Sequence, residues 1–143
     1  MIAIASDHGG FDLKQEVMAH LTRRGIAFKD YGSYDKTACD YPEYARLVTD
    51  AVLAKECELG ILICGTGIGI SIAANRREGI RCALCGDTFS AEATKLHNNA
   101  NVLALGGRVI GPELAFKIVD TFIDTPFSNE ERHIRRINLI EQQ

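Results

Sequence analysis

The sequence holds one cysteine and one threonine in a glycine-rich turn that directly follows an apolar segment. This stretch runs from Gly60 to Asn75 and contains the turn Cys64-Gly-Thr-Gly-Ile-Gly69. Glycines leave backbone N–H groups uncovered, and the N-terminus of a following helix adds positive potential, so negative charge is favoured at the turn. A thiol in such a place is a potential nucleophile or base. The structural alternative is a tightly packed turn with Cys64 as a small buried apolar side chain.

Other reactive side chains lie close to the ends of predicted strands. Asp7 and His8 follow the first apolar run, whereas Arg108 follows the last one and His97 lies shortly before it. Ligands of parallel sheets bind beyond the carboxyl ends of the strands. We therefore expect a carboxylate, two imidazoles, a thiol and an arginine to converge on one site. The structural alternatives are helix capping by Asp7, a surface turn for His8, and an interaction of His97 with the C-terminal end of its own helix.

Two arginines near the end of the chain indicate a phosphate. Arg132 and Arg136 are four residues apart, which places them on one face of a predicted helix, where like charges repel unless an anion lies between them. Guanidinium groups match phosphate oxygens in geometry and charge. The alternative is a solvated face on which Glu130 and Glu131 are the partners, and these carboxylates weaken phosphate binding if they face the pocket.

The composition favours a small-molecule partner. The chain has 143 residues and a formal net charge of −3, so no positive field attracts nucleic acid or an anionic membrane. The segment Met1–Asp7 lacks the basic region of a signal peptide, and the longest uncharged run, Leu59–Asn75, is short for a membrane span and broken by glycines. We expect a cytoplasmic protein with a single domain over residues 1–143.

The five cysteines are expected to be reduced thiols. Their number is odd, and they lack the close spacing of a small disulfide-linked domain. Cys82 and Cys85 have the spacing of a redox or zinc motif, but they lie in a predicted strand. Positions three apart on a strand point to opposite faces, so buried strand cysteines are favoured over a metal site.

Short apolar runs alternate with helical patterns along the whole chain, which is typical of an α/β protein with a parallel sheet. The runs are nearly continuous in apolar residues, as expected for strands that are covered on both faces. Five parallel strands are predicted: Ile2–Ser6, Ile26–Asp30, Gly60–Cys64, Arg81–Cys85 and Val102–Leu105.

Helices are predicted between and after these strands. One ends at Gly25, one begins at Pro42, and one covers Pro112–Ile123. Residues 32–40 are predicted to form a flexible loop. The capping-box pattern Ser128–Glu131 predicts the start of a last helix, whose isoleucines either fold back on the sheet or cover a neighbouring subunit.

Together these residues predict a proton transfer on a small phosphorylated substrate. An aldose–ketose isomerisation requires a base next to the carbonyl carbon, donors for an enediolate, and an acid that helps to open the sugar ring. Cys64, Thr66 with the amides of the turn, and His97 can supply these functions in that order. Neither a cofactor nor a metal is required. A nucleotide-binding sensor is the non-enzymatic alternative, although the turn lacks the complete G-x-G-x-x-G spacing of a dinucleotide site.

Six blocks, in order along nearly the whole chain, carry a family resemblance. They are Ser6–Phe11, Asp40–Pro42, Ile63–Asn75, His97–Asn98, Asn101–Gly106 and Arg132–His133. These blocks resemble the type B ribose-5-phosphate isomerases, a family grouped with the galactose-6-phosphate isomerase subunits and with isomerases of allose 6-phosphate.

The resemblance implies a Rossmann-like three-layer α/β/α sandwich and the interconversion of ribose 5-phosphate and ribulose 5-phosphate in the pentose phosphate pathway. An isomerase of a six-carbon sugar phosphate, either allose 6-phosphate or galactose 6-phosphate, is the alternative. The resemblance also implies a homodimer, in some members paired into a tetramer, with active sites shared between subunits and the C-terminal helix packed on the partner.

Residue roles are implied by the same resemblance. Cys64 is the base that moves the proton, Thr66 helps to hold the enediolate, and His97 assists ring opening. Because some members use a glutamate elsewhere as the base, the presence of Cys64 makes this chain similar to the cysteine-based branch. The implied substrate-binding residues are Asp7, Asn98 and Tyr41 at the sugar, Gly65, Gly67, Ile68 and Gly69 at the enediolate, and His8, Arg108, Arg132 and Arg136 at the phosphate.

Overall fold

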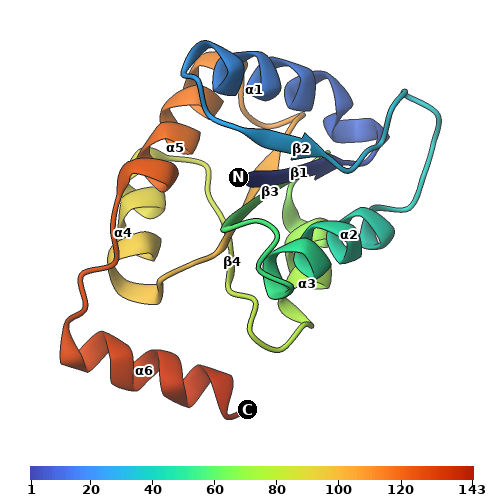
Figure 1. Ribbon diagram of the computed structural model, residues 1–143. Helices are drawn as coiled ribbons and strands as arrows, with labels where there is room; N and C mark the ends of the chain where they lie inside the picture. The colour runs from blue at the N-terminus through green and yellow to red at the C-terminus, as the bar shows by residue number, and fades with distance from the viewer.

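The computed structural model describes residues 1–143 and contains one parallel β-sheet between two layers of helices (Figure 1). The strands are β1 (Ile2–Ser6), β2 (Phe28–Asp30), β3 (Leu59–Cys64), β4 (Cys82–Leu84) and β5 (Val102–Gly106). They lie in the order β2-β1-β3-β5-β4, and every neighbouring pair is parallel. The predicted fold class, a Rossmann-like α/β/α sandwich with five parallel strands, is confirmed.

Both faces of the sheet are covered by helices. On one face lie α1 (Phe11–Arg23), α4 (Thr88–Asn98) and α5 (Pro112–Asp124), and on the other lie α2 (Tyr41–Leu53) and α3 (Ile68–Asn75). Side chains along a strand alternate between these layers. In β3, Ile61 and Ile63 pack in the first layer, whereas Leu62 and Cys64 pack in the second. Burial on both faces explains why the strands are continuously apolar in sequence.

Glycine and proline predict most helix boundaries correctly. α1 ends at Arg23, and Gly25 adopts a φ of 69°, in the left-handed region that favours glycine. α5 begins at Pro112, as predicted, and α2 begins one residue before Pro42. The short strands β2 and β4 at the sheet edges begin later than predicted, at Phe28 and Cys82.

The last helix, α6 (Glu131–Glu141), begins later than the capping-box pattern predicts. The hydroxyl of Ser128 does not cap α6 but donates to the carbonyl oxygen of Leu96 in α4, at 2.7 Å. This bond ties the tail to the end of α4, beside which α6 lies apart from the sheet (Figure 1). Ile134 and Ile140 are 40% and 50% exposed, so the predicted apolar stripe does not fold back on the sheet.

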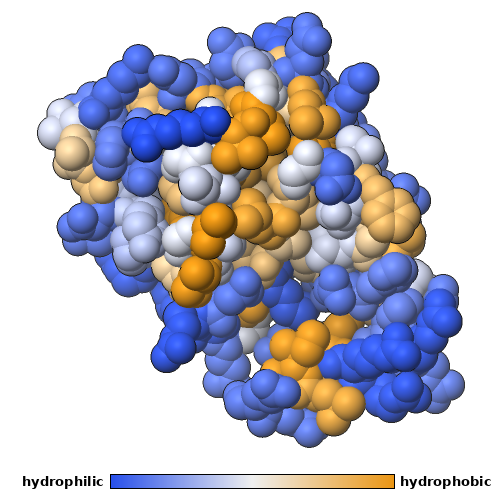
Figure 2. Space-filling view, turned by 180° about the vertical axis from the view of Figure 1, so that it is seen from behind, coloured by the Kyte–Doolittle hydropathy of each residue, from blue (hydrophilic) through white to orange (hydrophobic).

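Large apolar side chains are exposed both on the body and on α6. On the body they include Ile68, Ile72, Phe89 and Val109. Figure 2 shows apolar side chains gathered on the face opposite the view of Figure 1 and on α6. No helix in the structure is both long enough and apolar enough to cross a membrane.

Candidate active site

Three loops at the carboxyl ends of β1, β3 and β5 pack backbone against backbone. A Cβ atom on Gly10 would overlap with the carbonyl oxygen of Ile63, and one on Gly107 would lie 2.9 Å from the carbonyl oxygen of Gly9. Side chains therefore cannot be accommodated at Gly10 and Gly107. The candidate residues on these loops come together because their backbones touch.

Cys64 ends β3 and is buried. Its Sγ accepts a hydrogen bond of 3.2 Å from the N–H of Gly67, directly before α3. Gly67 has a φ of 78°, and a Cβ there would lie 2.5 Å from a side-chain carbon of Leu84. Glycine is therefore required to make the turn that aims an amide at the sulfur. The predicted thiol at a helix N-terminus is present.

The first turn of α3 offers two further amides. The N–H of Ile68 donates to Oγ1 of Thr66 at 3.2 Å. Those of Gly69 and Ile70 have no partner inside the helix, because they precede its first internal hydrogen bond, from Ser71. Beside the buried thiol there are thus uncommitted donors and an exposed threonine, which suit an oxygen that acquires negative charge.

Asp7 and His8 lie at the end of β1. The buried Asp7 carboxylate accepts from the N–H groups of Gly9 and Gly10 at 2.9 and 3.1 Å and caps the short helix η1 (His8–Gly10). The capping alternative for Asp7 is thus present in the structure. Nδ1 of His8 accepts from the N–H of Cys39 at 3.2 Å, so the neutral ring carries its proton on Nε2.

Arg108 and Tyr41 complete this edge of the sheet. The N–H of Arg108 donates to the carbonyl oxygen of Gly65 at 2.9 Å, and its side chain lies over Gly65, 3.3 Å from where a Cβ would stand. The ring of Tyr41, at the start of α2, covers Gly69 in the same way. The carboxyl edge therefore carries ten of the predicted site residues: Asp7, His8, Tyr41, Cys64, Gly65, Thr66, Gly67, Ile68, Gly69 and Arg108.

His97 and Asn98 lie at the opposite edge of the sheet, which corrects the expectation of one convergent site within a chain. They end α4, and three residues separate Asn98 from Val102, where β5 begins. Val102 pairs with Gly60, which lies four residues before Cys64. About 13 Å of strand therefore separates the start of β5 from Cys64 along the sheet. A residue that precedes a parallel strand lies at its amino end, and the rule for strand ends does not apply to His97.

Arg81 is a residue of this second edge that the sequence interpretation missed. Its guanidinium donates to the carbonyl oxygens of Asn98 and Asn99 at 2.8 and 2.9 Å and pairs with Glu141 at the end of α6. It therefore holds the end of α4 and the end of α6 together. No spacing pattern reveals such a contact, because Arg81 bonds to backbone atoms of distant elements.

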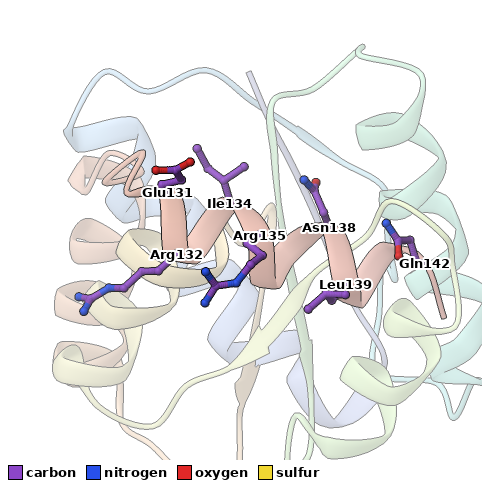
Figure 3. A pocket seen from close by; sticks show the side chains of 7 residues that line it. All are labelled: Glu131, Arg132, Ile134, Arg135, Asn138, Leu139 and Gln142. Carbon is purple, nitrogen blue, oxygen red and sulfur yellow. The ribbon is translucent and has the colours of Figure 1, made fainter.

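Arg132 and Arg136 lie on α6 and are exposed. Arg132 pairs with Glu130 at 3.0 Å, which is the solvated pairing that the sequence left as the alternative, whereas Arg136 forms no ion pair. α6 borders a surface hollow of about 610 Å³, whose lining side chains are drawn in Figure 3. Arg132 is the only predicted site residue in this lining, so the hollow is separate from Cys64.

Cys82 and Cys85 match the structural interpretation, in which they are strand cysteines and not a metal site. Cys85 packs in the core layer of α1, whereas Cys82 packs against that of α2, so their side chains lie on opposite faces of the sheet. Burial raises the pKa of Cys85 to about 11, with a smaller contribution from Asp87. No group of three histidine, cysteine, aspartate or glutamate side chains is arranged to hold a metal ion.

Comparison with known proteins identifies the relatives of this chain. The model of the family Ribose/Galactose Isomerase matches residues 2–140. Ribose-5-phosphate isomerase B of Escherichia coli is 46% identical, over 99% of this chain and 97% of that protein. A ribose 5-phosphate isomerase from Thermotoga maritima superposes with a TM-score of 0.97 at 53% identity, covering 99% of this chain and 97% of that one. A type B ribose 5-phosphate isomerase from Trypanosoma brucei superposes with a TM-score of 0.95 at 40% identity, covering 99% of this chain and 96% of that one. This chain is a member of the ribose/galactose isomerase family.

Proposed function

We propose that the protein interconverts ribose 5-phosphate and ribulose 5-phosphate through an enediolate. The observation that carries the proposal is the buried Sγ of Cys64 at the N-terminus of α3, beside the uncommitted amides of Gly69 and Ile70. A base and donors for a developing oxyanion are the two requirements of the reaction. The relatives named as ribose-5-phosphate isomerases support this choice of substrate.

The proposed reaction moves one proton between two carbons. The thiolate of Cys64 removes the proton from C2 of the open-chain aldose, and the C2–H electron pair forms the C1–C2 double bond of the enediolate. Thr66 and the turn amides of Gly65–Gly69 stabilise the negative oxygen. The thiol then returns the proton to C1, while the hydroxyl proton passes from O2 to O1. Asp7 and Tyr41 contact the sugar in this scheme.

The proposed phosphate site begins with His8 and Arg108. His8 directly precedes Gly9 and can donate from its Nε2–H, whereas Arg108 directly follows Gly107 and its guanidinium lies over Gly65. Phosphate oxygens accept hydrogen bonds from such donors, and the guanidinium adds a positive charge. A sugar phosphate that reaches from Cys64 to these groups is held at both ends. This binding keeps its reacting carbons next to the thiol.

We further propose that a second copy of the chain completes each site. His97, Asn98, Arg132 and Arg136 lie at the opposite edge from Cys64, so they are too distant to serve the thiol of their own chain. In a homodimer the amino edge of one subunit can meet the carboxyl edge of the other. His97 would then act as the ring-opening acid, Asn98 would contact sugar oxygens, and both arginines would bind phosphate. The exposed apolar side chains of α6 support such an interface.

The test is incubation with ribose 5-phosphate and detection of ketose by the wild-type protein and by Cys64→Ala. General acid–base groups contribute roughly 10²–10⁴-fold, so we expect kcat to fall by about that factor while the substrate still binds. Cys85→Ala is the matched control, because this cysteine is also buried at a strand end but packs in the other core layer. A Cys64→Ala enzyme with near wild-type kcat would exclude Cys64 as the base, and an inactive wild type would reject the proposed substrate.

A further inference from the structure

The exposed imidazole of His97 is held by a second histidine. Its ring stacks on the ring of His133, with centroids 4.5 Å apart and planes inclined by 19°. Neither nitrogen of His97 has a hydrogen-bond partner within the chain, so the stack is the contact that orients its ring. Aromatic pairs at this separation restrict each other's rotation.

His133 is built into the structure as a fixed support. It lies in the first turn of α6, where it is the only buried residue of that helix. The hydroxyl of Ser128 ties the preceding segment to Leu96, the residue immediately before His97. The stack is therefore fixed at both ends, by the backbone of α4 and by the anchored start of α6.

His133 also lacks a partner that would favour its protonated form. Its Nε2 is buried without a hydrogen bond, and the nearest carboxylate oxygen, on Glu130, is 3.9 Å away. Burial lowers the pKa of His133, and the positive charges of His97, Arg132 and Arg136 lower it further. The carboxylate of Glu130 raises this pKa, but by less than the other groups lower it. The supporting ring of His133 is thus neutral near pH 7. The stack therefore does not hold two positively charged imidazolium rings against each other.

We infer that His133 is a positioning residue for the acid that opens the sugar ring, through its stack on His97. The inference rests on the proposed function. Its consequence is specific to the step that opens or closes the sugar ring. Ribose 5-phosphate is a cyclic aldose, whereas ribulose 5-phosphate is open-chain, because its phosphorylated O5 cannot close on C2. Loss of the stack should therefore slow net conversion in both directions, since the equilibrium constant is fixed, but spare the formation of the enediolate from the open-chain ketose.

The test compares net isomerisation with proton exchange at C1 of ribulose 5-phosphate in D2O, for His133→Ala and His133→Phe. We expect His133→Ala to lower kcat with ribose 5-phosphate about tenfold, a part of the roughly 10²–10⁴ that a positioned acid supplies, with KM unchanged. The exchange at C1 should change by less than about twofold, because the ketose reaches the enediolate through Cys64 without the ring-opening acid. His133→Phe keeps an aromatic ring and should restore most of the lost rate.

Ile137→Ala is the matched control for a loosened helix. Ile137 lies one turn further along the same face of α6 and is half-buried, so its truncation weakens packing without removing the ring. An equal loss of net isomerisation in Ile137→Ala with intact exchange would overturn the inference, as would failure of His133→Phe to restore the rate. Equal losses of net isomerisation and of exchange at C1, or a raised KM, would assign His133 to phosphate binding or folding instead.

A spectroscopic readout separates this inference from the proposed function. The ring of His133 shifts the carbon-bound proton resonances of His97, so these NMR signals should move in His133→Ala and stay nearly in place in His133→Phe. An inactive wild-type enzyme would reject the proposed function, even if the NMR signals show the stack. Signals of His97 that do not respond to His133→Ala would overturn the stack itself.

Discussion

At the scale of single residues, Gly67 couples the backbone to the proposed base. It combines a left-handed φ of 78° with contacts that leave no room for a Cβ, 2.5 Å from Leu84 and 2.9 Å from the backbone of Leu105. We expect Gly67→Ala to destabilise the fold by more than the roughly 1–2 kcal/mol of the left-handed conformation alone, because the clash adds to it. The N–H of residue 67 would also move away from the Sγ of Cys64, so kcat should fall. Thermal unfolding and the isomerase assay measure the two effects.

Gly25→Ala is the matched control for Gly67→Ala. Gly25 has a φ of 69°, but nothing lies within 4 Å of the position of its Cβ. It therefore reports the conformational cost without the clash, and we expect a loss of about 1 kcal/mol with unchanged kcat. Equal losses of stability in the two variants would show that Leu84 and Leu105 can shift to make room for a Cβ at position 67. The turn would then not depend on its glycine.

The residues of the candidate site were predictable to different degrees. Cys64 and Asp7 were found because Cys64 ends a strand and Asp7 directly follows one, and strand ends are visible in sequence as the end of an apolar run. His97 was placed at the wrong edge, because the rule for residues that follow a strand was applied to a residue that precedes one. The support by His133 could not be predicted, since it depends on how α6 meets α4.

At the scale of elements, the docking of α6 should depend on pH through His133. The pKa of His133 is lowered in the fold, mainly by burial and then by the positive charges of His97, Arg132 and Arg136, whereas the carboxylate of Glu130 raises it. A histidine with a lowered folded pKa stabilises the docked state above its unfolded pKa of about 6.5, and this stability is lost as pH falls toward the folded pKa. We expect amide protection in α6, relative to α5, to be constant above about pH 7 and to fall below about pH 6.5.

His133→Phe provides the control for the docking of α6. It keeps the aromatic packing but removes the titrating group, so the ratio of α6 to α5 protection should no longer change between pH 7 and pH 5. If the wild-type ratio is equally flat, the protonation of His133 does not oppose docking. The elements themselves were largely predictable from apolar runs, glycines and prolines, but the start of α6 was not, because Ser128 bonds to Leu96 rather than to its own helix.

At the scale of the whole molecule, the two separated groups of residues predict that sites form only between chains. If Cys64 of one subunit works with His97 of the other, a mixed dimer of Cys64→Ala and His97→Asn has one doubly altered site and one intact site. Each variant alone should convert ribose 5-phosphate slowly, whereas random mixing should restore about a quarter of the wild-type rate, since half of the dimers are mixed and each holds one intact site. Pairing Cys64→Ala with the double variant Cys64→Ala/His97→Asn is the control, because no arrangement of these chains contains an intact site. Mixed dimers that stay as slow as their parents would mean that the edge carrying Cys64 works without His97 of the second copy.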